Sequence, residues 1–126
     1  MKLLKQLVIP PDYNQVKFQF IFLLTRKQDY LTYIKALEDN EKFSENGYIE
    51  LFPFDELDEI NEEYQVASHV PNFVTIGTNG AGVGIFFNKN NNRIYSIPFV
   101  GMEEKDAVLL ADSFTEFIYK FENEGL

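Results

Sequence analysis

The chain of 126 residues contains no cysteine and only one histidine, His69. Without cysteine there is no disulfide framework and no thiolate nucleophile. A zinc site of the common type draws several ligands from Cys and His, so the sequence excludes such a site as well. We therefore expect no metal and no cofactor, and a fold that its hydrophobic core holds together.

A long apolar segment is also missing. The longest apolar run, FIFLL at 20–24, is far shorter than the roughly 20 residues that span a bilayer. The N-terminal stretch MKLLKQLVIPP has no small-residue cleavage site after its leucines, so it is not typical of a signal peptide. These absences predict a cytoplasmic protein without a membrane contact.

The whole chain carries a net charge of −9. Basic residues are scarce outside its N-terminal quarter. Residues 1–35 hold six Lys and Arg against two acids, and residues 36–126 hold five against eighteen. Nucleic-acid binders show a basic stripe, whereas this field repels phosphate backbones. It attracts a basic protein partner, although a strongly negative surface also serves solubility alone.

Aromatic residues are plentiful, with thirteen Phe and seven Tyr, and 45% of the chain is hydrophobic. A chain of this length buries roughly two-thirds of its unfolded surface, which is enough for an independent core. We therefore expect one domain over residues 1–126. The composition leaves its oligomeric state open.

Four of the seven glycines fall in IGTNGAGVGIFF at 76–87. A dinucleotide-binding loop leads from a strand into a helix, and a P-loop ends in Gly-Lys-Ser/Thr. Neither context is present, because Gly84 leads directly into an apolar strand-like run. We expect Asn79 and Gly80 to form a tight turn with positive φ. Gly82 and Gly84 would then allow a bulge or a close backbone approach.

The first half of the chain indicates helices and one strand. Residues 14–24 fit a strand by alternation and a helix by one apolar face, and the pattern does not decide between them. A capping box at 25–28 opens a helix up to about residue 40. A polar loop at 40–47 precedes a strand at 48–52.

Residues 55–64, DELDEINEEY, predict an acidic amphipathic helix with Leu57, Ile60 and Tyr64 as its buried stripe. Six carboxylates lie within these ten residues, and several form like-charged pairs at spacings of three and four residues. Such pairs cost a little stability. The acids of the first turn are favourable at the positive end of the helix.

Three short strands follow, at 73–76, 83–87 and 94–99, with an asparagine-rich hairpin loop at 88–92 between the last two. A capping box, SFTE at 113–116, opens a C-terminal helix. This order lacks the regular alternation of a parallel sheet. We predict an α+β fold in which N-terminal, middle and C-terminal helices pack on a mostly antiparallel sheet of about four or more strands.

The acidic helix is the candidate binding site. Its carboxylates lack an EF-hand pattern, and a glycosidase pair needs a cleft that the sequence does not indicate. A solvated face and a docking surface for a basic partner both remain consistent with the sequence. The candidate residues for partner binding are Asp55, Glu56, Asp58, Glu59, Glu62 and Glu63, with Tyr48 and Phe52 as aromatic contacts.

No catalytic residue is expected. Ser68 and His69 are adjacent, but neighbouring side chains rarely face each other and a triad draws its members from separate elements. Aromatic residues near the acidic helix, such as Tyr48, Phe52 and Phe54, are either binding anchors or core residues. We expect a protein that is not an enzyme.

The second half of the chain resembles the SUKH superfamily, which includes Smi/Knr-type cell-wall assembly regulators and many bacterial immunity proteins. The resemblance covers roughly residues 46–119 and rests on an ordered series of motifs. These are NGYIELFPFDELDEINEEY, PNFVTIGTNGAGVGIFF, RIYSIPFVGM and ADSFTEFI. The Pro10-Pro11-Asp12 stretch also resembles the start of the first helix of the family, which favours a helix at 14–24.

This resemblance implies a non-enzymatic α+β module that binds proteins. Bacterial members resemble antidotes that bind and block a toxin domain, often a basic nuclease, and the fungal branch implies a regulatory scaffold. The resemblance implies no catalytic residue. It also implies that Gly77, Asn79, Gly80 and Gly82 belong to the fold signature.

Overall fold

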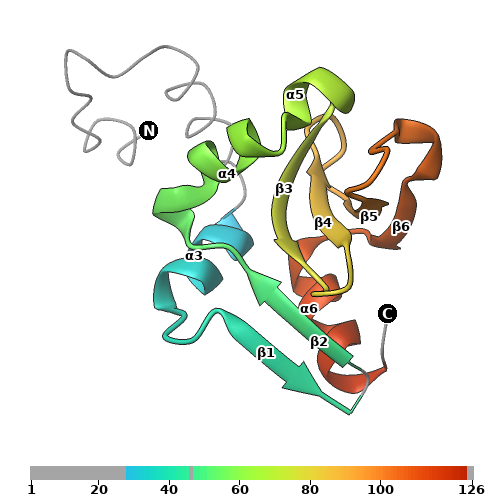
Figure 1. Cartoon of the computed structure of the whole chain (residues 1–126). Coiled ribbons are helices and arrows are strands. Elements are labelled where there is room, and N and C mark those ends of the chain that lie inside the picture. Colours follow the sequence, from blue (N-terminus) through green and yellow to red (C-terminus); the bar gives the residue numbers. More distant parts are fainter. Residues whose placement is uncertain (1–27, 46, 125–126) are drawn as a thin grey trace.

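The computed structural model describes residues 28–45 and 47–124 (Figure 1). The helices are α3 (Gln28–Ala36), η1 (Phe54–Glu56), α4 (Leu57–Glu63), α5 (Val66–His69), η2 (Glu104–Asp106) and α6 (Phe114–Asn123). The strands are β1 (Glu41–Ser44), β2 (Gly47–Leu51), β3 (Phe73–Thr78), β4 (Val83–Asn88), β5 (Ile94–Pro98) and β6 (Val108–Ala111). The alternatives for 14–24 and residues 25–27 of the capping box lie outside the described residues.

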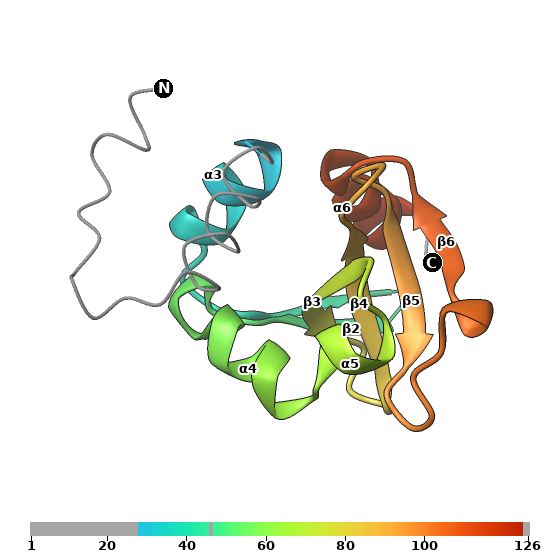
Figure 2. The same ribbon diagram turned by 90° about the horizontal axis from the view of Figure 1, so that it is seen from above.

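The six strands form one antiparallel sheet whose spatial order, β1 to β6, is the order of the sequence. The sheet curls, and helices pack on both of its faces (Figure 2). The predicted α+β class with a mostly antiparallel sheet is therefore confirmed. No helix within the described ranges is long and apolar enough to cross a membrane.

The central strand β4 contributes to a hydrophobic core on each face of the sheet. Ile85 and Phe87 point toward α3 and α6 and belong to the larger cluster. Phe86 points the other way and belongs to a smaller cluster with Val66 and Val70 of the α5 region. Burial of all three side chains explains why this strand is an unbroken apolar run.

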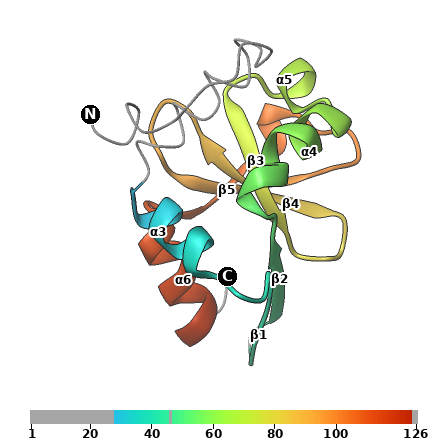
Figure 3. The same cartoon turned by 90° about the vertical axis from the view of Figure 1, so that its left-hand side faces the viewer.

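α3 and α6 lie side by side on one face (Figure 3), whereas α4 and α5 lie on the opposite face. The Asp29 carboxylate joins α3 to α6. Its Oδ2 accepts hydrogen bonds from the backbone N–H and the hydroxyl of Thr115 at 3.1 and 3.0 Å. The side chains of Tyr30 and Phe114 meet edge to face at 5.2 Å between ring centroids.

Three short elements differ from the expectation. Residues 41–44 form β1 instead of part of a loop, because they pair with β2 in a hairpin, although EKFS has few strand-forming side chains. Residues 108–111 form the edge strand β6, and residues 66–69 form the one-turn helix α5. Each is four residues long, too short for a period to be visible.

The glycine-rich segment is a turn between two strands, as predicted. Gly80 and Gly82 adopt φ values of +77° and +85°. Gly84 allows a close approach, since a Cβ there would lie 2.6 Å from the ring of Phe99. The bulge occurs in β3 instead, where the register shifts between Thr75 and Gly77.

The start of α6 has the predicted cap. The Ser113 hydroxyl accepts a hydrogen bond from the Glu116 N–H at 3.1 Å. Glu116 Oε1 reaches back to the N–H of Asp112 at 3.4 Å, one residue earlier than in the standard capping box. The apolar stripe of the helix is buried, as expected, at Phe114, Phe117, Ile118 and Phe121.

Candidate functional site

The amide of Asn61 fixes the acidic helix on the sheet. Asn61 Nδ2 donates to the carbonyl oxygens of Leu57 and Thr75, and Asn61 Oδ1 accepts from the Thr75 N–H at 3.0 Å. One side chain thus satisfies both backbone groups of Thr75 at the point where the bulge of β3 begins. This arrangement holds α4 over β3 while Glu59, Glu62 and Glu63 stay on the surface.

The predicted helix consists of η1 followed by α4. Asp55, Glu56, Glu59, Glu62 and Glu63 are exposed. None of these five forms an ion pair within the described part of the chain. Asp58, the sixth candidate, is half-buried. The structure therefore brings the candidate acids together on one short, mostly exposed segment.

The expected buried stripe of this helix is only partly correct. Leu57 is fully buried and Ile60 is half-buried, but Tyr64 is 41% exposed. The reason is that α4 ends at Glu63, and Gln65 then turns the chain with φ of 56°. Tyr64 instead stacks on Phe99, with ring centroids 4.2 Å apart and planes 13° apart.

Among the aromatic candidates, Phe52 is only 7% exposed and lies in the larger core cluster. It is therefore not available as a surface contact, because β2 leads directly into the core at this point. Phe54 is half-buried beneath the Lys35 ammonium, which lies 5.6 Å from its ring centroid.

Tyr48 is half-buried and lies opposite Phe43 in the β1–β2 hairpin, with ring centroids 4.9 Å apart. Its hydroxyl donates to Glu41 Oε2 at 3.2 Å. Desolvation raises the pKa of Tyr48, and the nearby carboxylates of Glu41 and Glu50 add to this effect. Tyr48 is thus an aromatic side chain in an acidic environment.

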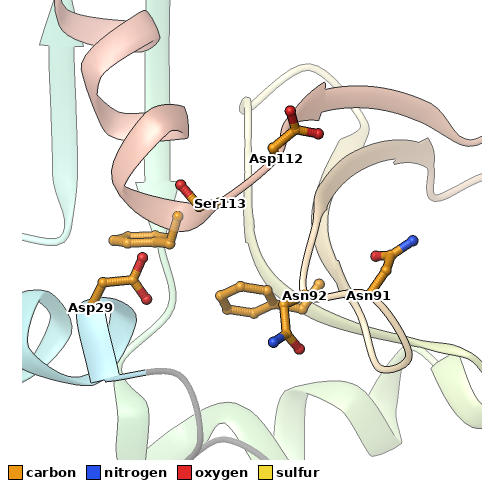
Figure 4. A pocket seen from close by; sticks show the side chains of 7 residues that line it. Asp29, Asn91, Asn92, Asp112 and Ser113 are labelled. Atoms are coloured by element: carbon orange, nitrogen blue, oxygen red, sulfur yellow. The ribbon is translucent and has the colours of Figure 1, made fainter.

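A cavity of about 320 Å³ lies elsewhere, between the start of α3, the β4–β5 loop and the start of α6. Figure 4 shows Asp29 and Asp112 on its walls, with Asn91 and Asn92. Both carboxylates have protein partners, since Asp29 binds Thr115 and Asp112 Oδ1 lies 3.2 Å from Arg93 Nε. No residue of η1 or α4 lines this cavity. The acidic helix and the cavity are therefore separate features.

The histidine has a structural contact. His69 Nδ1 donates to the carbonyl oxygen of Gln65 at 2.9 Å, within the same turn of chain. Across the described ranges, no group of three or more His, Asp or Glu side chains gathers closely enough to hold a metal ion.

Several apolar side chains at or near the surface were not among the sequence-based candidates. Phe43 is 75% exposed, Val100 is 91% exposed, and Phe99 is half-buried beneath Tyr64. Phe43 falls in a segment that the sequence indicates as a polar loop, and Phe99 follows a strand whose end is not visible in the pattern. For Phe43 and Phe99, the available signal was an aromatic residue within two positions of a turn or in it.

A sequence model of the SMI1 / KNR4 family (SUKH-1) matches residues 25–120. The match spans the described sheet and most of α6, and includes the acidic helix and the glycine turn. A comparison with curated protein sequences finds no match. With well over half of its length matched, the chain belongs to the SMI1 / KNR4 family (SUKH-1).

Proposed function

We propose that this chain is a cytoplasmic immunity protein that binds a basic toxin domain and blocks it. Membership of the SMI1 / KNR4 family supports a non-catalytic module of the immunity or regulator type. The observation that carries the proposal is the exposed group of acids on η1 and α4, of which five form no ion pair within the described residues.

The contacts that attach α4 to the rest of the fold come from residues other than its exposed acids. Only Leu57 is fully buried in this helix, and the amide of Asn61 supplies its link to the sheet. Exposed carboxylates without internal partners attract a cationic surface over several ångströms and are available for new ion pairs. Electrostatic steering would speed association, and contacts formed after docking would set the lifetime of the complex.

The decisive experiment examines the genes next to the gene of this chain for a toxin. The chain is then co-expressed with that toxin. Survival of the host in the presence of the toxin, together with a salt-sensitive complex of the two purified proteins, is the expected result. The double charge reversal Glu59→Lys/Glu62→Lys should slow association and weaken rescue. A matched control reverses two exposed acids elsewhere, Asp106→Lys/Glu124→Lys, and should retain both.

Unchanged affinity and association rate in the first variant would show that the binding face lies elsewhere. Absence of rescue by the unmodified chain would contradict the immunity role itself.

The second candidate is a regulatory scaffold of the cell-wall assembly type, which the family membership equally supports. Reproducible complexes with several synthesis or signalling proteins, each reconstituted from purified components, would favour it over the immunity role. A carboxylate-dependent hydrolase has less support, because all the acids of α4 except the half-buried Asp58 are exposed and none of them lines the described cavity.

A further inference from the structure

Two partly exposed aromatic pairs lie on the sheet face that carries α4 and α5. The first is Phe43 and Tyr48 of the β1–β2 hairpin, and the second is Tyr64 stacked on Phe99. Tyr48 belongs to this face because the next residue, Ile49, enters the larger core cluster on the opposite side. Phe99 belongs to it because it packs against the smaller cluster.

The glycine turn at 79–82 connects the two pairs. On one side, the ring of Tyr48 lies 2.8 Å from where a Cβ of Gly80 would be. On the other, the Phe99 N–H donates to the carbonyl oxygen of Gly82 at 3.0 Å. A Cβ at Gly82 would meet nothing within 4 Å, so the surface above this residue is open. We call Phe43, Tyr48, the turn 79–82, Phe99 and Tyr64 the aromatic strip.

The floor of the strip is fixed before any partner arrives. Asn79 Oδ1 accepts from the Ala81 and Val83 N–H groups at 2.8 and 3.3 Å. The Thr78 hydroxyl accepts from the Gly80 N–H at 3.1 Å and donates to the Val83 carbonyl oxygen at 2.9 Å. A preorganised surface loses little conformational entropy on binding.

The charge around the strip is negative. Glu41 accepts from the Tyr48 hydroxyl, Glu50 follows Tyr48 on the same face of β2, and Glu62 and Glu63 directly precede Tyr64. The basic residue of this hairpin points away. Lys42 alternates with Phe43 and extends toward α6, with Nζ 3.9 Å from Glu122 and 5.4 Å from the ring centroid of Tyr33.

We infer that the aromatic strip is the docking surface for a basic segment of a protein partner, an assignment that rests on the proposed function and extends its acidic face. Aliphatic and guanidinium groups of the partner pack on the exposed rings of Phe43 and Tyr64. The Lys and Arg side chains of the partner pair with the carboxylates beside Tyr48 and with those beside Tyr64. The bare turn lets the backbone of the partner approach closely, which gives the glycines a second use beyond turn geometry.

The first test selects a displayed library of random peptides against the full-length protein. We expect the selected peptides to be rich in Arg and Lys, and to shift the backbone amide resonances of Gly80 and Gly82 on titration. A selection that yields no binder, peptides without basic enrichment, or shifts confined to another part of the molecule would each overturn the inference.

Substitutions give a second measurement with the same peptides. Phe43→Ser and Tyr64→Ser remove exposed rings and should each weaken the peptide Kd by about tenfold or more, as binding hot spots do. Tyr119→Ser on α6 removes a ring that is 57% exposed on the other side of the molecule and should change Kd less than about twofold. Equal losses in all three variants would contradict the assignment.

The inference about the aromatic strip and the proposed immunity function can fail independently of each other. If the double variant Phe43→Ser/Tyr64→Ser still protects the host from the toxin at full strength, the immunity role is supported and the aromatic strip is not the docking surface. If basic peptides bind at the strip while the unmodified chain gives no protection, the docking surface stands and the immunity role does not.

Discussion

The helices α6 and α4 show two ways in which this chain attaches a helix to its sheet. α6 buries four large apolar side chains and begins with a serine cap, and its half-buried Glu116 pairs with Lys120 at 3.2 Å. α4 has one fully buried residue, no side-chain cap, and exposed acids that form no ion pair within the described residues. Packing explains the four buried residues of α6, whereas the exposed acids of α4 have no comparable role in packing, so they point to a role outside the fold.

The largest loss of stability is expected from damage to the packing of α6. Phe117→Ala removes a ring that is fully buried in the larger cluster, so we expect the free energy of unfolding to fall by about 3–5 kcal/mol. Urea unfolding followed by circular dichroism measures this loss. The control, Tyr119→Ala, lies on the exposed side of the same helix and should cost less than about 1 kcal/mol. Similar losses in both variants would contradict the assignment of α6 as the apolar anchor.

The matching test for α4 removes its amide link. Asn61→Ala leaves the N–H and the carbonyl oxygen of Thr75 without their partner, which should cost about 1–3 kcal/mol. Hydrogen exchange should localise the effect, with faster exchange at the Thr75 amide and little change in α6. A variant with native stability and slow exchange at Thr75 would mean that packing, and not Asn61, positions α4.

The smallest effect on stability is expected where the proposed effect on binding is largest. Glu59→Gln/Glu62→Gln removes charges from exposed positions and relieves like-charge repulsion, so stability should stay within about 0.5 kcal/mol of the native value or rise slightly. Thermal unfolding with and without added salt measures this. A large destabilisation would show that these acids serve the fold, and the contrast between α4 and α6 would disappear.

Elements with a strong local signal were predictable from the sequence. The apolar stripe of α6 and its cap, the strands around the glycine turn and the acidic segment all depend on neighbours along the chain. β1 was missed because its strand state comes from pairing with β2, a tertiary contact that EKFS does not encode by itself. The exposed side of Tyr64 was missed because a left-handed residue, Gln65, ends the helix just where the apolar stripe predicts burial.

For the site, the sequence located the acids but not the aromatic residues beside them. Six adjacent carboxylates are visible in one line of sequence. The pairs Phe43–Tyr48 and Tyr64–Phe99 join residues from different elements, and only the folded sheet brings them to the same glycine turn. Phe52, expected as a contact, lies in the core for a related reason, since strand alternation alone does not reveal where a chain enters the core.

The sheet order, in which each strand pairs with its neighbour in sequence, has a consequence for how the chain folds. The β1–β2, β3–β4, β4–β5 and β5–β6 pairings each close a short loop, so their entropic cost is small and they are available early. The contact of Asp29 with Thr115 instead joins residues 86 positions apart. We expect α6 to dock on α3 late in folding. The larger hydrophobic cluster should then exclude water only after α6 has packed on it.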